Sequence, residues 1–438
     1  MSRFQSRVLD GGRPVGQVGL RMTGENRLPL GGVKVADFSW FGAGPICGRL
    51  LADYGATVVR VESETRVDSL RVVAPFAKGK TGYNVSGYFN NYNAGKLGIL
   101  LNCNTDDGQR IARRLIEWAD VFLTNITPRV IERWGMTYEN LVKINPQIIA
   151  AYQPMQGFDG PHRDFLGFGA VLTPITGYNH LSGFAGRPPM GLGTNYPDYV
   201  INPGHTFVAI MAALHYRNRT GKGQRVECAQ VESSCAPLAP AIFDYTANGR
   251  VQGPQGNNLP YAAPHNAFKC KPVSDGGRPM DERWIAIACF SEEEWQALVE
   301  AMGKPDWALD AKFASLEGRK KNEAELEAGI GPWTADKDAY DLMEDLQGRG
   351  VPAGVVQSAR EILDVDEHMK ARGYYAYIEH PEAGVHAHDG PPFVLSKTPG
   401  RVRSPAPLLG EHTEYVCKEI LGLDDEGIAE LMVAGALA

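Results

Sequence analysis

The sequence predicts an α/β protein in which a large domain built on a parallel sheet is followed by a smaller α/β domain. The first observation is that short apolar runs alternate with helical patterns from residue 33 to about residue 151, as in consecutive βαβ units. The second is an irregular stretch, 246–265, whose glycine, proline and asparagine content is typical of a link between domains. The third is a return to strand and helix patterns after that stretch. A chain of 438 residues is long enough for two or three domains with cores of their own.

The strands and helices of the first half follow one another in a regular order. The opening strand is VKVADF, and after it come the helix PICGRLLADYG and the strand TVVRVE. Later strands are expected in GILLN, DVFLTN and QIIAAY, with helices in GQRIARRLIEWA and PRVIERWG between them. Pro45 and Pro128 suit the first turns of two of these helices. Thr127 suits the cap before the second of them, and Gly55 suits the end of the first.

The second half of the chain predicts a longer helix, a linker and a new start. The helix is expected over about 203–218, before TGKGQ and the strand-like RVECAQ. Beyond the linker, WIAIACF indicates a strand and SEEEWQALVEAMG a helix, and the tail returns to a helical LGEHTEYVCKEILGL. The expected parts are an N-terminal extension (1–32), a large domain (33–245), a linker (246–265), a small domain (266–350), and a return linker with the C-terminal part of the large domain (351–438).

Composition and charge argue against several classes of protein. A formal net charge of −7 disfavours a general nucleic-acid binder, which needs a clustered basic surface to neutralise phosphates. No uninterrupted apolar stretch approaches the roughly 20 residues that span a bilayer, and residues 1–32 lack the apolar core of a secretory signal. The seven cysteines are irregularly spaced and contain no CxxC pair, which favours reduced thiols in a cytoplasmic enzyme over disulfides or a zinc site. We therefore expect no nucleic acid, membrane or metal as partner.

The turn after the first strand raises the question of a nucleotide ligand. Gly42, Gly44 and Gly48 form a GxGxxxG pattern, and Glu62 ends the next strand at a distance that suits a ribose contact. Pro45 removes a backbone N–H at the place where a pyrophosphate needs a donor, which disfavours a nicotinamide dinucleotide. Two interpretations stay open, namely a loop that contacts another ligand and glycines that let a helix pack tightly on a strand.

A series of ten motifs in order carries a family resemblance. The first five are DFSWFGAGPICGRLLADYGATVVRVE, VDSLR, NAGKLGILLN, ADVFLTNITPRVIERWG and INPQIIAAYQPMQGFDGPHRD. The others are YPDY, AALHYRNRTGKGQRVE, RWIAIA, VPAGVV and PLLGEHT. From about Val33 to the C-terminus the chain resembles the class III CoA-transferase family, also called CaiB/BaiF, and in particular its formyl-CoA transferase and benzylsuccinate CoA-transferase-like members.

This resemblance implies a fold and an assembly. It implies a Rossmann-like large domain with a parallel sheet, a smaller α/β domain and a long linker between them. It also implies that two chains thread through each other as interlocked rings, either as a homodimer or as a heteromer with a homologous subunit. The expected substrates are an acyl-CoA and a carboxylic acid, so the first turn would line a coenzyme A site rather than a dinucleotide site.

The resemblance places the catalytic nucleophile at Asp198, in TNYPDYVINPGHTF just before the long helix. In this family an aspartate carboxylate attacks the acyl-CoA thioester, which gives a mixed anhydride and then an aspartyl-CoA thioester. The spacing from Asp198 to Leu214 is one residue longer than in formyl-CoA transferase, so an ungapped match would put Tyr199 at this position. A phenol is poorly suited to anhydride chemistry, which keeps Asp198 as the prediction. The alternative is that Asp198 only caps a helix or a turn.

The coenzyme A contacts are also carried over from the resemblance. Arg133 suits the adenosine phosphates, because a guanidinium matches phosphate geometry. Arg71 and Asp68 match the family's GD-x-x-R motif and either contact coenzyme A or pair with each other. An arginine that follows the second-strand glutamate in formyl-CoA transferase is a serine in this sequence. Arg60 or Arg66 would have to make its contact with coenzyme A instead. The expected contacts are Phe41, Ala43, Arg71, Leu101, Asn104, Asn125 and Arg133.

Two departures from the family pattern bear on the substrate. Phe168 stands where the racemases carry a histidine, and a phenyl ring cannot move the α-proton that racemisation exchanges. The glycine-rich loop of formyl-CoA transferase has no counterpart at 259–265, which argues against formyl-CoA and oxalate. Aromatic-rich loops suggest a bulky or aromatic acceptor acid, although the same rings would also serve as core. These aromatic residues are Phe158, Phe165, Phe168, Tyr178, Phe184, Tyr196 and Tyr199.

The predicted function is transfer of CoA from an acyl-CoA, such as succinyl-CoA, to a carboxylic acid. Two alternatives remain. One is an acyl-CoA racemase or isomerase of the same family, and the other is a non-catalytic subunit of a heteromeric CoA-transferase.

Overall fold

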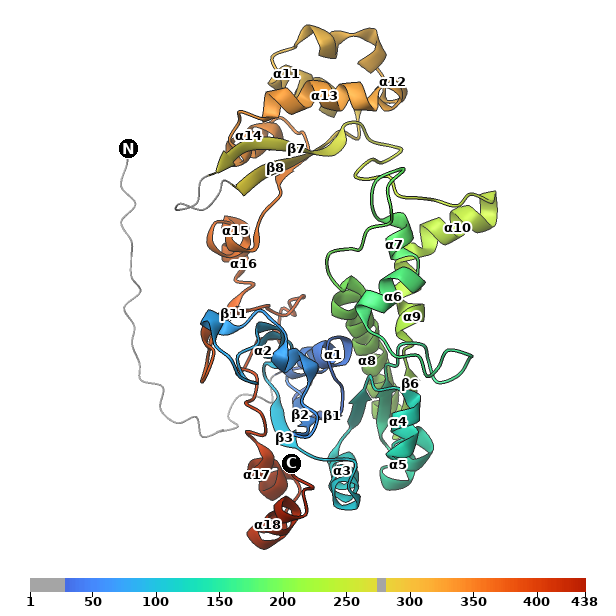
Figure 1. Ribbon diagram of the computed structural model, residues 1–438, viewed down its shortest axis with the longest axis vertical. Coiled ribbons are helices and arrows are strands. Elements are labelled where there is room, and N and C mark those ends of the chain that lie inside the picture. Colours follow the sequence, from blue (N-terminus) through green and yellow to red (C-terminus); the bar gives the residue numbers. More distant parts are fainter. Residues whose placement is uncertain (1–27, 274–280) are drawn as a thin grey trace, which may run out of the picture.

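The structure, a computed structural model, describes residues 28–273 and 281–438, which form two bodies joined by long connecting segments (Figure 1). The larger body contains the first part of the chain and its C-terminus, and the smaller body contains the segment from about 265 to 355. The predicted N-terminal extension lies outside the described residues up to residue 27.

The larger body is built on a six-stranded parallel sheet. Its strands are β1 (Lys34–Asp37), β2 (Thr57–Glu62), β3 (Leu97–Leu100), β4 (Val121–Thr124), β5 (Ile149–Tyr152) and β6 (Gln224–Glu227). They lie in the order β3-β2-β1-β4-β5-β6, so the chain starts in the middle of the sheet and winds outward to both sides. This is the strand order of a Rossmann-like doubly wound sheet, which confirms the predicted fold class.

Helices cover both faces of this sheet, because side chains of successive strand residues point to opposite faces. One face packs against α1 (Ala43–Asp53) and α8 (Asn202–Thr220). The other face packs against α3 (Asp106–Trp118), α4 (Pro128–Arg133), α5 (Tyr138–Ile144) and α18 (Asp425–Val433). The C-terminal segment therefore completes the core of the larger body, although it is distant in sequence from the strands that it covers.

The smaller body is a three-stranded antiparallel sheet covered by helices. Its strands are β7 (His265–Val273), β8 (Asp281–Ala288) and β9 (Ala353–Val355) in that order, and its main helices are α11 (Glu292–Ala301), α12 (Leu316–Lys321), α13 (Glu323–Thr334) and α14 (Ala339–Gly348). The third strand lies past residue 350, where the sequence pattern ends the small domain. It belongs to this body because it pairs with the distant β8, and local periodicity does not reveal such pairing.

Shorter elements lie between and around these two bodies (Figure 1). They are α2 (Gly87–Asn93), α6 (Gly169–Ile175), α7 (Tyr178–Leu181), α9 (Gln230–Cys235), α10 (Ala239–Asn248), α15 (Ala359–Asp364), α16 (Glu367–Arg372), the hairpin β10 (Ala376–His380) and β11 (Gly384–His388), and α17 (Thr413–Tyr415). Each of the seven cysteines is a free thiol in this structure. Across residues 28–273 and 281–438, no helix combines the length and the apolar character that crossing a bilayer requires. The predicted interlocked dimer involves a second chain and stays a prediction.

Candidate active site

A cavity of about 460 Å³ opens at the carboxyl ends of four neighbouring strands, β3, β2, β1 and β4. Much of its wall comes from the segments that end or follow those strands, at 38–43, 61–66, 101–104 and 125–134. In doubly wound sheets, ligands bind in the crevice where the strand order reverses, and here that point lies between β1 and β4. The cavity therefore has the position expected of a substrate site.

Asp198 reaches this cavity from the segment in front of α8. It lies in a π-helical turn, Pro197–Ile201, and is only 2% exposed. Its Oδ2 accepts a 2.6 Å hydrogen bond from the backbone N–H of Gly169, and the side-chain amide of Asn202 donates to its Oδ1 at 3.5 Å. Burial raises the pKa of the Asp198 carboxyl to about 6, although these two donors oppose the rise. At neutral pH the carboxylate is thus ionised and more basic than an exposed one.

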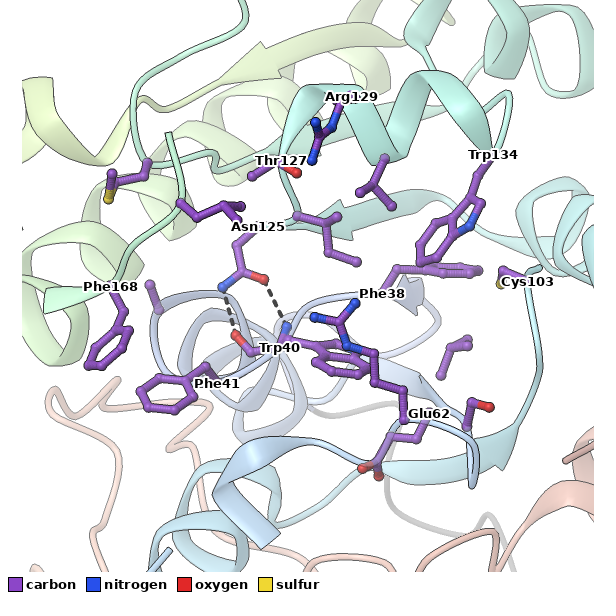
Figure 2. A pocket seen from close by; sticks show the side chains of 18 of the residues that line it. Phe38, Trp40, Phe41, Glu62, Cys103, Asn125, Thr127, Arg129, Trp134 and Phe168 are labelled. Atoms are coloured by element: carbon purple, nitrogen blue, oxygen red, sulfur yellow. Dashed lines mark hydrogen bonds between the residues drawn. The ribbon is translucent and has the colours of Figure 1, made fainter. Parts of the chain in front are cut away.

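The turn after β1 is tied to the loop after β4 by Asn125 (Figure 2). The side-chain oxygen of Asn125 accepts from the backbone N–H of Trp40 at 2.8 Å, and its Nδ2 donates to the Trp40 carbonyl at 2.7 Å. The next residue, Phe41, has a left-handed backbone with a φ of 63°, which is uncommon for a residue with a β-carbon. Its ring centroid lies 4.9 Å from that of Phe168. Two phenyl rings thus stand together beside the peptide that binds Asp198.

The glycines of this turn allow close approach in two ways. A β-carbon at Gly42 would lie 3.3 Å from the Tyr199 ring and 3.6 Å from Cβ of Asp198, so the turn packs directly against the candidate nucleophile. A β-carbon at Gly44 would lie 2.3 Å from Cβ of Ser39, so this glycine lets α1 begin close to the strand end. Gly44 therefore serves packing, whereas Gly42 lines the cavity, and contact of this turn with a ligand stays a prediction.

Three arginines line the cavity and make one part of it positive. Arg129 and Arg133 are four residues apart on α4, so their side chains share a face of that helix. Arg66 follows β2, and its guanidinium lies 5.2 Å from the centroid of the Trp40 ring. Guanidinium groups match the oxygens of phosphates. This part of the cavity therefore suits an anionic, phosphate-bearing ligand.

Arg71 does not line the cavity, although the resemblance made it an expected coenzyme A contact. Its guanidinium is fully buried and donates to both carboxylate oxygens of Glu62, at 2.9 and 2.7 Å. Asp68, its expected alternative partner, pairs with Arg60 instead. The physical reason is local: Asp68 caps a short 3-10 turn by accepting the N–H of Leu70, and that turn directs Arg71 into the interior. Burial favours a higher pKa for Glu62, but Arg60 and Arg71 together hold its pKa below the usual value.

The aromatic residues expected around an acceptor acid do not gather in one place. Phe165 and Phe168 line the cavity. Phe158 instead packs edge-on against the buried ring of Tyr152, with the ring centroids 4.9 Å apart. Tyr199 borders a second cavity of about 320 Å³, whose wall includes the segment 191–195. Few of these aromatic rings lie at the cavity, so most of them give no support to a bulky or aromatic acceptor acid.

The main cavity nonetheless collects most of the residues expected from the sequence. Asp198 lines it together with six of the expected coenzyme A contacts, which are Phe41, Ala43, Leu101, Asn104, Asn125 and Arg133. Sequence reasoning missed Arg129 and the backbone N–H of Gly169. The four-residue spacing between Arg129 and Arg133 was a signal that could have identified Arg129. A backbone donor leaves no signal in the sequence. Within the part of the chain that the structure describes, no group of three or more His, Cys, Asp or Glu side chains is arranged to hold a metal ion.

Comparison with known proteins assigns the chain to a family. The family model for CoA-transferase family III matches residues 30–413. The chain belongs to CoA-transferase family III. Succinyl-CoA–D-citramalate CoA-transferase from Chloroflexus aurantiacus is 34% identical over 406 residues, which cover 92% of this chain and 96% of that protein. The beta subunit of succinyl-CoA–L-malate CoA-transferase from the same organism is 31% identical over 412 residues, which cover 92% of this chain and 97% of that protein.

Solved structures agree with this assignment. A CaiB/BaiF family protein from Brucella suis has a TM-score of 0.80 at 30% identity, over 90% of this chain and 100% of that chain. The family resemblance and the enzyme class predicted from the sequence are thereby confirmed. This family III chain is a CoA-transferase.

Proposed function

We propose that this CoA-transferase carries an acyl group on Asp198 while CoA passes from an acyl-CoA donor to a free carboxylic acid. The observation that carries the proposal is the Asp198 carboxylate, which is buried in the wall of an arginine-lined cavity and accepts the N–H of Gly169. CoA transfer between carboxylic acids is nearly thermoneutral, so the task is to lower the barrier while water is kept from acting as acceptor. A covalent intermediate on a desolvated carboxylate meets both needs.

Four displacements complete the exchange. The Asp198 carboxylate attacks the thioester carbonyl and expels CoA thiolate, which leaves a mixed anhydride between Asp198 and the donor acyl group. The thiolate then attacks the Asp198 carbonyl of that anhydride, which gives an aspartyl-CoA thioester and releases the donor acid as its carboxylate. The acceptor carboxylate attacks this thioester, forming a second anhydride and freeing the thiolate again. The thiolate finally attacks the acceptor acyl carbonyl, which releases the new acyl-CoA and restores the Asp198 carboxylate.

The cavity provides separate surroundings for the two ends of the CoA substrate. Arg66, Arg129 and Arg133 carry the charge that suits its phosphates. Phe41 and Phe168 flank the region beside Asp198 where the thioester has to lie. We therefore propose as coenzyme A contacts the six cavity residues expected from the sequence together with Arg66 and Arg129.

The substrates are proposed from the names of relatives. Proteins 31–34% identical to this chain are named for succinyl-CoA as donor and for D-citramalate, L-malate or mesaconate as acceptor. We propose succinyl-CoA as the donor here. An acceptor screen should compare short dicarboxylic acids with the bulky or aromatic acids that the sequence suggested.

A racemase or isomerase is less well supported by this cavity. Moving an α-proton requires a base on each face of the carbon. Within the described residues, the cavity wall contains no histidine, and its Glu62 is held by Arg71. If the enzyme exchanged the α-hydrogen of an acyl-CoA with deuterated solvent and transferred no CoA to added acids, the racemase or isomerase would become the better supported function.

A non-catalytic subunit is the second candidate, because one relative is named as a beta subunit. The outer surface of α10 exposes Ile242, Phe243 and Tyr245 to at least 50%, and apolar surface of this kind is typical of an interface. We propose that a second chain covers it, in the interlocked dimer that the resemblance implies. Light scattering on the purified protein tests the assembly, and activity of this polypeptide alone would exclude the subunit interpretation.

The decisive experiment traps the covalent intermediate. The enzyme is incubated with succinyl-CoA and an acceptor acid in the presence of hydroxylamine, and peptides are then analysed by mass spectrometry. We expect an aspartyl hydroxamate at Asp198 and nowhere else. Replacement Asp198→Asn should lower kcat by about 10⁴-fold or more while CoA still binds. Full activity of that variant, or a hydroxamate only at another residue, would refute the proposal.

A further inference from the structure

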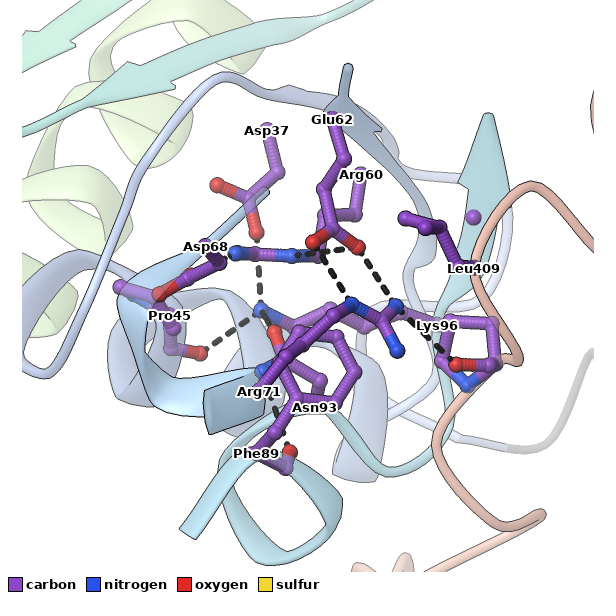
Figure 3. Close-up of polar contacts among 12 residues, drawn as sticks. Asp37, Pro45, Arg60, Glu62, Asp68, Arg71, Phe89, Asn93, Lys96 and Leu409 are labelled. Carbon is purple, nitrogen blue, oxygen red and sulfur yellow. Dashed lines mark hydrogen bonds and ion pairs between the residues drawn. The ribbon is translucent and has the colours of Figure 1, made fainter. Parts of the chain in front are cut away.

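Six charged side chains are buried beneath the turn that leads into the cavity (Figure 3). They form four ion pairs, in which Arg60 pairs with Asp68 and Glu62, Arg71 also pairs with Glu62, and Lys96 pairs with Asp37. None of these residues is more than 3% exposed. The cluster thus combines three basic with three acidic side chains and is almost fully buried, with Glu62 also lining the cavity. The reaction steps above make no use of it.

One ion pair of this cluster binds the backbone of the turn. Arg60 donates to the carbonyl of Ser39 at 2.9 Å. Oδ2 of Asp68 accepts the N–H of Phe41 at 3.2 Å, while its Oδ1 accepts the N–H of Leu70 at 2.9 Å. The bond to Phe41 falls at the residue whose left-handed backbone is the least favourable of the turn.

The other end of the turn is held by the same cluster. Lys96 donates to the carbonyl of Pro45 at 2.8 Å, within the first turn of α1, and also to Asp37 at 2.8 Å and Asn93 at 3.0 Å. The turn is therefore anchored on both sides, with Phe41 and Gly42 between the anchors.

The anchored part of the turn is the part that contacts Asp198. Gly42 packs against Cβ of Asp198 and the ring of Tyr199. Phe41 packs against Phe168, the residue before the peptide that donates to the Asp198 carboxylate. A shift of the turn would therefore move both the wall beside the carboxylate and the peptide that holds it.

We propose that Asp68, together with Arg60, is a positioning residue for the transfer reaction. By holding Phe41 in its left-handed conformation, the pair keeps the turn against Asp198, so that carboxylate and thioester meet in the geometry that reacts. The inference rests on the proposed role of Asp198 as acyl carrier.

A purely stabilising role makes a different prediction. Replacing both members of a buried ion pair by apolar side chains of similar volume often leaves stability unchanged or higher, whereas removing one member leaves a buried charge without its partner. Such a replacement would preserve the fold here but would still remove the acceptor for the N–H of Phe41. Stability and positioning can therefore be separated by choosing the right variants.

The test compares Asp68→Asn and the double variant Arg60→Met/Asp68→Leu with the parent enzyme. In Asp68→Asn, the amide NH2 faces the N–H of Phe41 or that of Leu70, so one of these two hydrogen bonds is lost. In the double variant, residue 68 has no hydrogen-bond acceptor. We expect kcat to fall about 10- to 100-fold in both, as for a small misplacement of reacting groups. The dissociation constant for free CoA, measured by calorimetry, should change less than kcat does, because two of the three arginines that suit its phosphates, Arg129 and Arg133, lie on α4 and not in this turn.

A matched control exists outside the cavity wall. Glu361 of α15 is also a buried carboxylate in an ion pair, with Arg283 of β8 at 2.5 Å, and neither residue lines the cavity. Glu361→Gln should lower the melting temperature as Asp68→Asn does while kcat stays at the parent value. This comparison separates positioning from loss of stability.

Three results would overturn the inference. They are parent kcat in both folded Asp68 variants, a loss of CoA affinity as large as the loss of kcat, and an equal loss of kcat in Glu361→Gln. Trapping in the parent enzyme keeps the two proposals apart. If no hydroxamate forms at Asp198, the proposed function fails; if it forms and the Asp68 variants turn over normally, only the positioning role fails.

Discussion

The backbone N–H of Gly169 donates to Oδ2 of Asp198 over 2.6 Å, and the absence of a side chain at residue 169 makes this contact possible. A β-carbon there would lie 2.8 Å from the same oxygen and 2.5 Å from Cβ of Asn195. These separations are shorter than real β-carbon contacts allow. The position of the carboxylate therefore depends on a glycine 29 residues earlier in the chain.

The first prediction is that Gly169→Ala displaces the carboxylate and lowers kcat. We expect a loss of about 100-fold, comparable to that caused by misplacing a reacting group, and steady-state rates with succinyl-CoA measure it. Gly204→Ala in α8 is the matched control, because a β-carbon at that position meets nothing within 4 Å and alanine favours a helix. Equal activity of the two variants would contradict this role of Gly169.

The second prediction concerns the pH dependence of acylation. Attack requires the ionised carboxylate, and burial raises the pKa of Asp198 to about 6. Below that value, kcat/KM for the acyl-CoA should fall by about tenfold per pH unit, and above about pH 7 it should be constant. Initial rates at constant ionic strength give the profile. A profile that stayed flat down to pH 5 would mean that another group limits the reaction.

The same raised pKa has a consequence for stability, with a definite sign. Between the unfolded value of 3.8 and the folded value of about 6, the folded state binds more protons, so the contribution of Asp198 to stability falls as pH rises through this range. Above pH 6 the buried charge persists in the fold. Asp198→Asn should therefore be more stable than the parent at pH 8, by at most about 3 kcal/mol, and the difference should vanish below pH 4. Urea unfolding of both proteins at several pH values measures it.

The third prediction is that the two arginines of α4 bind the charged part of the CoA substrate. Arg129→Ala and Arg133→Ala should each raise KM for the acyl-CoA about tenfold or more, with a smaller change in kcat, because a hydrogen bond to a charged group is lost. The effect should weaken at high salt. Arg113→Ala on α3 is the control, since this exposed arginine lies outside the cavity wall. Similar KM values for all three variants would contradict the assignment.

The fourth prediction concerns acid stability of the β10–β11 hairpin. The ring of His388 is fully buried, and within the described residues neither of its nitrogens has a hydrogen-bond partner. Burial lowers its pKa to about 3, so that the unfolded chain binds a proton between pH 6.5 and pH 3 that the folded chain does not. Stability is thus fully present above pH 6.5 and is lost as pH falls through this range.

His388→Leu removes this titration. Between pH 7.5 and pH 5, the unfolding free energy of the variant should fall by about 2 kcal/mol less than that of the parent. Urea unfolding at both pH values provides the measurement. The control is His162→Leu, because His162 is exposed in a loop. Identical pH slopes for parent and His388→Leu would show that this ring does not control acid stability.

Much of the larger body followed from local pattern. Short apolar runs between helical patterns predicted the parallel strands, since a strand buried on both faces has to be apolar along its length. Pro45 lies in the first turn of α1, and the pattern around Gly42 marked the turn that lines the cavity. The third strand of the smaller body was not predicted, because Ala353–Val355 is short and belongs there through pairing with a distant strand.

The surroundings of the charged residues were harder to predict from the sequence than the strands and helices. Arg60, Arg66 and Arg71 come from one short stretch, yet only Arg66 lines the cavity, and the other two are fully buried. Arg71 donates to the carbonyl of Pro407, 336 residues further along the chain, as well as to its near neighbour Glu62. No local pattern reports such a partner.

The sequence by itself determined the order of strands and helices, the glycine turn after the first strand and the family resemblance, and it suggested Asp198 as the nucleophile that we propose. These depend on residues close together in the chain, where backbone geometry and periodic burial leave a readable trace. Only the tertiary structure decided which arginines face the cavity, which carboxylates are neutralised inside, and that a peptide N–H at Gly169 binds Asp198. Those outcomes depend on contacts between distant segments, because the free energy of a buried charge is set by the partners that the fold brings to it.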